Sequence, residues 1–249
     1  MAQGNAGGSS RRQMLYIDGL LVELTRKRVK NINLRIRRDG TIAVSAAPRV
    51  PITSIEEFVR SRHDWIEEAR GRVIHACETV DGSCIDGGSW WLWGERLTID
   101  LQVMAASGRR AGCSFERGEG LLHVCADERI ADDGEASRTA RDRALESWGR
   151  SLLHRRVEET LPHCEDVVGA SCSAWRLRSM RSRWGSCNVQ TKVITLSTQL
   201  VHHDPRCLEY VIIHELCHLY EPSHNQRFHA LMDRFCPDWR ERRRLLNGR

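Results

Sequence analysis

The segment between Asp204 and Pro222 constrains the fold most, because both ends of a helix are defined there. Asp204 is a favourable N-cap and Pro205 suits the first helical position, whereas Pro222 cannot continue a helix. We therefore predict a helix from Pro205 to about Tyr220. Its central residues, VIIHELCHLY from Val211 onward, are mainly apolar, so we expect the helix to pack against the interior of the protein.

This helix contains the pattern HExxH, which places two imidazoles and one carboxylate where they can act on one metal ion. His214 and His218 are four residues apart and therefore lie on one face, one turn from each other. Glu215 lies on the flank of that face, where it can reach a metal-bound water without ligating the metal. We predict His214 and His218 as metal ligands and Glu215 as the general base.

A catalytic zinc site needs a third protein ligand, for which His224 is the candidate. His224 follows His218 by six residues and lies beyond the helix stop, where a chain that folds back can supply a ligand. The spacing matches the HExxHxxGxxH pattern of metzincins, except that Glu221 occupies the glycine position. We expect Pro222 and Ser223 to make the turn instead, and we predict that Zn²⁺ is the bound metal.

Such a site predicts a zinc metallopeptidase that hydrolyses polypeptides. Zinc lowers the pKa of its bound water to about 7. Glu215 would then take a proton from the attacking water and pass it to the leaving amine. Arg183 and Tyr220 are candidate hydrogen-bond donors to the oxyanion.

Other residues near the site are expected to have ordinary roles. We interpret His202, His203 and His229 as solvated or capping histidines, because most surface histidines bind no metal. Cys217 lies between the two ligands in sequence, but its direction on the helix predicts packing against the core.

The remainder of the chain predicts strands first and helices later. Alternation and turn signals predict strands over residues 16–24, 29–36, 41–45, 90–103 (broken near Gly94), 121–125, 174–180 and 193–200. Further helices are expected over 53–76, capped by Thr53 or Ser54, over 135–161, ended by Pro162, and after His224 with a break at Pro237. Residues 105–120 and 184–191 read as turns.

This order of elements indicates an α+β protein. We expect an N-terminal β-rich lobe with one helix and a C-terminal, zincin-like helical lobe that carries HExxH. The corresponding divisions are a disordered tail (1–12), a β-rich subdomain (13–130) and a catalytic subdomain (131–249).

Composition limits the compartment and the partners. No apolar run among the 249 residues approaches the roughly 18 that a membrane helix needs, so we expect no membrane contact. The N-terminal residues lack the apolar region of a secretory signal, which favours a cytoplasmic protein. The 10 cysteines are scattered without a CxxC pair, and we expect them to be mostly buried, reduced thiols.

Two blocks of sequence resemble the YgjP-like metallopeptidases, which are similar to the SprT and Spartan group of zinc proteases. The blocks are RSRWGSC (181–187) and HELCHLYEPSHNQRF (214–228), and residues 27–66 resemble the opening hairpin and helix of the family. The likeness extends over nearly all of residues 14–245. It implies zinc bound by His214, His218 and His224, with Phe228 closing the segment.

Two other functions stay open. A basic hairpin, formed by Arg26–Lys30 and Arg35–Arg38, is a candidate for weak contact with nucleic acid phosphates, in particular through Lys27, Arg28 and Lys30. The chain would then be a DNA-associated module whose protease acts on DNA-bound proteins, as the Spartan likeness suggests. The second alternative is a zinc-stabilised scaffold without turnover. Glu215 argues against it, because a structural site needs no base and fills its fourth position with a protein ligand.

Overall fold

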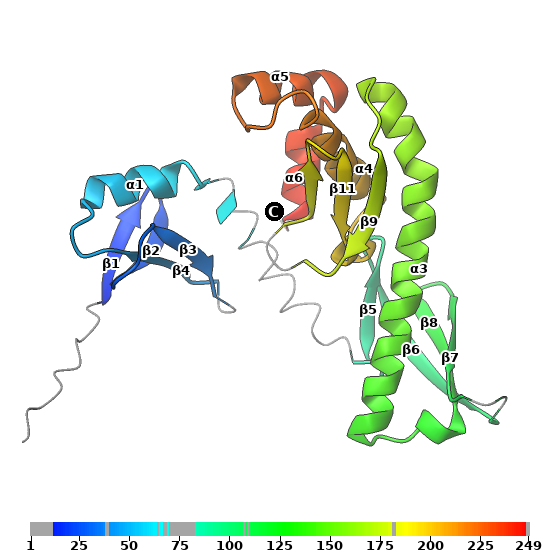
Figure 1. The fold of residues 1–249 in the computed structure, drawn as a ribbon. Helices are drawn as coiled ribbons and strands as arrows, with labels where there is room; N and C mark the ends of the chain where they lie inside the picture. The colour runs from blue at the N-terminus through cyan, green and yellow to red at the C-terminus, as the bar shows by residue number, and fades with distance from the viewer. Residues whose placement is uncertain are drawn as a thin grey trace, which may run out of the picture. The chain divides into compact units, whose positions relative to one another are not determined.

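The computed structural model describes residues 12–37, 40–63, 65–66, 69, 83–106, 108, 110–180 and 183–247 (Figure 1). Its contacts divide the chain into two compact units, Met1–His75 and Ala76–Arg249, each with its own hydrophobic core. Sheets dominate the N-terminal part and helices the C-terminal part, so the class is α+β as predicted. The tail expected over residues 1–12 lies outside the described residues, except for Arg12.

The first unit is a four-stranded sheet with a helix packed on one face. Its elements are β1 (Arg12–Ile17), β2 (Leu20–Arg26), β3 (Asn33–Ile36), β4 (Ile42–Ala46) and α1 (Ile52–Arg60). The strand order is β1-β2-β4-β3, in which β2 and β4 are parallel and the other pairs are antiparallel. Alternate strand residues point inward and form the core of this unit with Ile55 and Val59 of α1.

The N-terminal strand expected over residues 16–24 is in fact a hairpin of two strands. Asp18 and Gly19 have positive φ angles of 48° and 84° and connect β1 to β2. An Asp-Gly pair between strands is a strong hairpin signal, because both turn positions need a positive φ. The prediction of one continuous strand was therefore wrong at a place where the sequence did contain the signal.

The helix of the first unit begins two residues earlier than a cap at Thr53 predicts. α1 starts at Ile52 with Pro51 at the N-cap, and no side chain caps it. Thr53 and Ser54, the expected caps, therefore lie within the first turn. The latter part of the helix expected over 53–76 lies largely outside the described residues.

Part of the basic hairpin takes part in internal bonds of the first unit. The Arg26 guanidinium donates to two backbone carbonyls that follow β4, at 3.0 and 2.7 Å. Arg37 forms a bidentate ion pair with Glu23, at 2.8 and 2.6 Å. Lys27 and Arg28 are exposed. Contact between them and nucleic acid stays a prediction.

In its described residues, the second unit combines two sheets, one long helix and three shorter α-helices (Figure 1). Its first half contains β5 (Ser89–Leu92), β6 (Glu95–Met104), β7 (Cys113–Arg117), β8 (Leu121–Asp127), η1 (Glu128–Ile130) and α3 (Glu135–Val168). Its second half contains β9 (Ala174–Arg178), β10 (Gly185–Asn188), β11 (Val193–Ser197), η2 (Thr198–His202), α4 (Pro205–Cys217), α5 (Gln226–Phe235) and α6 (Trp239–Leu246). The sheet orders are β5-β6-β8-β7 and β10-β11-β9.

One core joins both sheets of the second unit to α3 and α4. α3 contacts β7 of the first sheet and also α4, and β9 of the second sheet runs beside it in Figure 1. This core runs across residue 130, where the sequence suggested a boundary between subdomains. The observed division, after His75, differs from that expectation because the long helix packs against elements on both sides of residue 130.

α3 continues through Pro162, where we predicted its end. A proline inside a helix removes one hydrogen bond and costs about 3 kcal/mol. The buried stripe of the helix nevertheless continues beyond it with Cys164 and Val168. Burial of apolar side chains at about 1.5–3 kcal/mol each offsets the cost of the proline. The helix ends at Gly169, whose φ of 71° is typical of a left-handed cap.

The structure also bears on the predicted chemistry of the cysteines and on membrane contact. The nine cysteines in the described part of the chain are all free thiols, and five of them are buried. Burial raises the pKa of Cys84 and Cys207 to about 12, so both thiols stay protonated at neutral pH.

Within the described ranges, no helix combines the length and the apolar character that a membrane span requires.

Candidate metal centre

α4 is the element that positions the two histidines of HExxH. The Asp204 side chain accepts a hydrogen bond from the backbone N–H of Arg206 at 2.8 Å, and Pro205 is the first helical residue, as predicted. The helix ends at Cys217 rather than near Tyr220. His214 therefore lies in its last turn and His218 at its C-cap, where the chain turns away toward α5.

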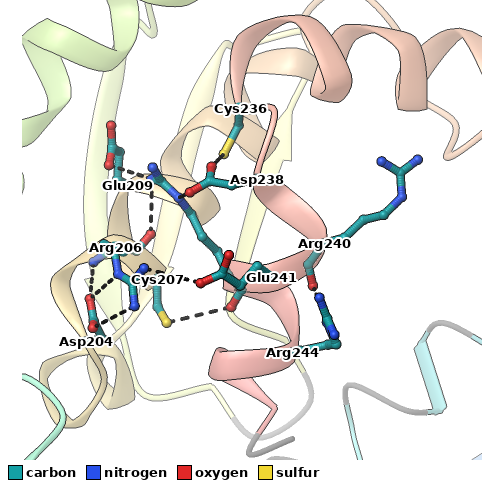
Figure 2. Close-up of polar contacts among 10 residues, drawn as sticks. Asp204, Arg206, Cys207, Glu209, Cys236, Asp238, Arg240, Glu241 and Arg244 are labelled. Atoms are coloured by element: carbon teal, nitrogen blue, oxygen red, sulfur yellow. Dashed lines mark hydrogen bonds and ion pairs between the residues drawn. The ribbon is translucent and has the colours of Figure 1, made fainter.

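Two ion pairs hold the N-terminal half of α4 against α6 (Figure 2). Arg242 of α6 donates to Glu209 of α4 at 2.5 Å and to Asp238 at 2.8 Å. Arg206 of α4 donates to Glu241 of α6 at 3.4 Å. These contacts join the last helix of the chain to the helix that carries the histidines.

Three imidazoles meet at the C-terminal end of α4. His214, His218 and His224 each offer a ring nitrogen within 4.8 Å of the other two. The Nε2 atoms of His214 and His224 lie 2.9 Å apart. Two ligand nitrogens on a tetrahedral zinc ion lie about 3.3 Å apart, so the three rings converge as ligands of one ion would. The structure thus brings together the three residues that the sequence suggested as ligands.

The tautomer of His218 suits metal binding. Its Nδ1 lies 3.0 Å from the backbone carbonyl of Glu221 and can donate to it. A histidine whose one ring nitrogen donates to a carbonyl presents the other nitrogen, unprotonated, to a metal. This hydrogen bond also limits rotation of the His218 ring.

Burial favours the neutral form of His214 and His218. Desolvation lowers the pKa of His214 well below its usual value, and the proximity of His218 and His224 lowers it further. Burial also lowers the pKa of His218. Neutral imidazole is the form that binds metal ions, and a set of nitrogen ligands is typical of zinc. The chemistry of the donor set therefore fits that ion.

Phe228 contacts all three histidine rings. Its ring centroid lies 4.9 Å from that of His214, 4.7 Å from His218 and 4.7 Å from His224. Phe228 is only 1% exposed and lies in the first turn of α5, where its backbone N–H donates to the Asn225 side chain at 3.1 Å. It therefore forms an apolar support that holds the three rings together and excludes water from that side.

Glu215 is buried against β10, at 5% exposure. A Cβ atom at Gly185 would lie 2.8 Å from both Cγ and Cδ of Glu215, closer than real contacts allow. Gly185 thus makes room for the carboxylate. Burial raises the pKa of Cys187, which lies on the same strand as Gly185, to about 11, and the nearby charge of Glu215 adds to this shift.

Gly185 is a site residue that we did not name from the sequence. Residues 184–191 read as a turn, so β10 was not predicted, although its residues Gly185–Asn188 pair with β11. The signal that was available is the block RWGSC, which contains this glycine. The structure explains why that block and HELCH occur together, since one provides the space that the other fills.

The Tyr220 hydroxyl forms a hydrogen bond with the end of α3. Its hydroxyl donates to the carbonyl of Gly169 at 2.9 Å and lies 3.2 Å from that of Val168, at the end of α3. The structure therefore shows Tyr220 in contact with this helix and not in the predicted role of a donor to an oxyanion. Arg183 is exposed, and its role as a donor stays a prediction.

The three neighbouring histidines are half-buried and pack on tryptophan rings, so they are less solvated than predicted. The pairs are His202 with Trp90, His203 with Trp184 and His229 with Trp239. Burial accordingly lowers the pKa of His202. Cys217 is fully buried in the core, as its direction on the helix predicted.

Comparisons with known proteins identify the class as metallopeptidase. A family model described as YgjP-like, metallopeptidase domain, matches residues 30–249, and the chain belongs to this family. The crystal structure of the metallopeptidase zymogen of Pyrococcus abyssi abylysin is 25% identical in sequence. The match covers 36% of this chain and 87% of the abylysin chain, with a TM-score of 0.32. A search of curated proteins finds no match.

Proposed function

We propose that this metallopeptidase is zinc-dependent and holds its zinc through His214, His218 and His224. The convergence of their ring nitrogens within 4.8 Å is the observation that carries the proposal. Three protein ligands leave a fourth position for water or substrate, which distinguishes a catalytic zinc site from a structural one. If the zinc had a purely structural role, the buried Glu215 beside the histidine cluster would have no function.

Glu215 is the proposed general base. When bound, zinc supplies a Lewis acid that lowers the pKa of water and polarises a carbonyl oxygen. The Glu215 carboxylate takes a proton from the attacking water and delivers it to the nitrogen of the leaving amine. Its packing against Gly185 holds the carboxylate in one position, which favours rapid proton transfer.

The proposed substrate is a polypeptide in an extended conformation. β10 is at one end of the order β10-β11-β9 and contacts α4, which carries Glu215. An extended chain can add to such a sheet edge through backbone hydrogen bonds. Because Gly185 of β10 lies against Glu215, a peptide paired there would pass close to the base.

The proposal is tested by metal content and hydrolysis together. Elemental analysis of protein purified without added metal should find one zinc per chain in the wild type and little in His218→Ala. Glu215→Gln should keep its zinc but lose hydrolysis of a denatured protein by about 10²–10⁴-fold. Glu146→Gln, on the exposed face of α3, is the matched control and should retain activity. A wild type without zinc would refute the proposal.

A further inference from the structure

We propose that Tyr220 is a positioning residue that anchors the metal-binding loop to the end of α3. The loop comprises residues 218–225, between α4 and α5, and carries two of the three proposed ligands, His218 and His224. This inference rests on the proposed zinc site. It assigns to Tyr220 a role that acts through the ligands rather than on the substrate.

The backbone of this loop is held mainly by short-range bonds. The N–H groups of Leu219, Tyr220, Glu221 and Asn225 donate to carbonyls no more than four residues earlier in the chain. Residues 222–225 are all exposed. Local bonds shape such a loop but do not by themselves fix its position relative to the rest of the protein. Contacts with other elements place the ligands, among them that of Phe228 with the histidine rings.

Tyr220 supplies a further contact, with the end of α3. Its hydroxyl donates to the Gly169 carbonyl, 51 residues earlier in the chain, at 2.9 Å, and the Val168 carbonyl lies at 3.2 Å. The last carbonyls of a helix have no partner within the helix and are free to accept such a bond. α3 spans 34 residues and packs into the same core as both sheets, so it provides a rigid reference for the loop.

The anchor lies next to a bond that orients a ligand. Glu221 follows Tyr220 directly, and its carbonyl accepts the hydrogen bond from Nδ1 of His218 at 3.0 Å. Fixing Tyr220 therefore limits movement of the peptide that holds the His218 ring. Glu221 also stands where the metzincin pattern has its glycine, and its carboxylate accepts a bond from the Ser223 N–H at 3.2 Å, within the turn.

The hydroxyl can be removed with little other change. The Tyr220 side chain is 46% exposed, so Tyr220→Phe removes one hydrogen bond but little buried surface. Tyr16 is 76% exposed and belongs to the other compact unit. Tyr16→Phe is therefore a matched control, with the same chemical change at a distance from the site.

The test compares zinc affinity and zinc release in the wild type, Tyr220→Phe and Tyr16→Phe, by competition with a chromophoric chelator. Loss of a group that supports a metal ligand typically weakens binding 10–100-fold, and we expect Tyr220→Phe to bind zinc about tenfold more weakly. Release should be faster, whereas thermal unfolding of the zinc-free proteins should be unchanged. The absorption spectrum of bound Co²⁺ should also change in Tyr220→Phe, because it reports ligand geometry.

The outcomes separate the two proposals. If wild type and Tyr220→Phe bind zinc equally tightly, the anchoring role is overturned and the zinc site stands. If Tyr220→Phe lowers the stability of the zinc-free protein and leaves zinc affinity unchanged, its role is structural only and the inference is again overturned. If the wild type binds no zinc, both proposals fall.

Discussion

The Glu215 carboxylate occupies the space that a side chain at Gly185 would need. These residues are far apart in the sequence, on α4 and β10, and a Cβ at Gly185 would approach both Cγ and Cδ of Glu215 to 2.8 Å. The relationship links the two blocks of sequence, 181–187 and 214–228, on which the resemblance to the family was based. It also explains why the strand beside the proposed base begins with a glycine.

Gly185→Ala should separate catalysis from metal binding. The added methyl group must displace the carboxylate, so we expect hydrolysis to fall at least about tenfold while zinc content stays at the wild-type level. Overpacking should also lower the free energy of unfolding by about 1–3 kcal/mol. Steady-state kinetics and elemental analysis provide the measurements. Gly112→Ala is the control, since a Cβ there meets nothing within 4 Å. An unchanged kcat would show that the carboxylate needs no fixed position.

Phe228→Leu should weaken the metal site more than the fold. Leucine fills less of the space beneath the three imidazoles, which gain freedom to rotate. We expect zinc affinity to fall about tenfold and the free energy of unfolding to fall by about 1 kcal/mol. Chelator competition and urea unfolding measure the two effects. Phe115→Leu, which changes a ring stacked on Trp148, should leave zinc affinity at the wild-type value.

Arg242→Ala should destabilise the contact between α6 and α4. The Arg242 side chain is 15% exposed and that of Glu209 is 28% exposed, so the change leaves a half-buried carboxylate without its partner. We expect a loss of about 2 kcal/mol in the free energy of unfolding, less than for a fully buried pair. Arg244→Ala, on an exposed residue of α6, should cost under about 0.5 kcal/mol. Equal losses in the two variants would contradict a specific contribution of Arg242.

The same network predicts a dependence of stability on pH. The hydrogen bond from Arg242 holds the pKa of Asp238 below its usual value of 3.8. A carboxylate with a lowered pKa stabilises the folded state above its usual pKa, and this stabilisation is lost as the pH falls through the lowered value. The stability difference between wild type and Asp238→Asn should therefore be full at neutral pH and shrink below a pH of about 3.8. Urea unfolding of zinc-free protein across this range provides the test, and a difference that grows in acid would have the wrong sign.

The sequence by itself determined the features that depend on neighbouring residues. The start of α4 follows from Asp204 and Pro205, whose preferences act within one turn. The helical repeat then places His214 and His218 on one face, wherever the helix packs. The spacing from His218 to His224 was likewise available from the sequence, whereas the end of α4 at Cys217, five residues before Pro222, was not.

The tertiary structure alone decided the features that join distant residues. β10 reads as a turn in isolation and is a strand because it pairs with β11 and packs on α4. α3 passes Pro162 because buried contacts outweigh a local penalty. Tyr220 looked like a donor to substrate until its hydroxyl was found at Gly169. In each case the deciding energy comes from a contact with a distant part of the chain, which local periodicity does not encode.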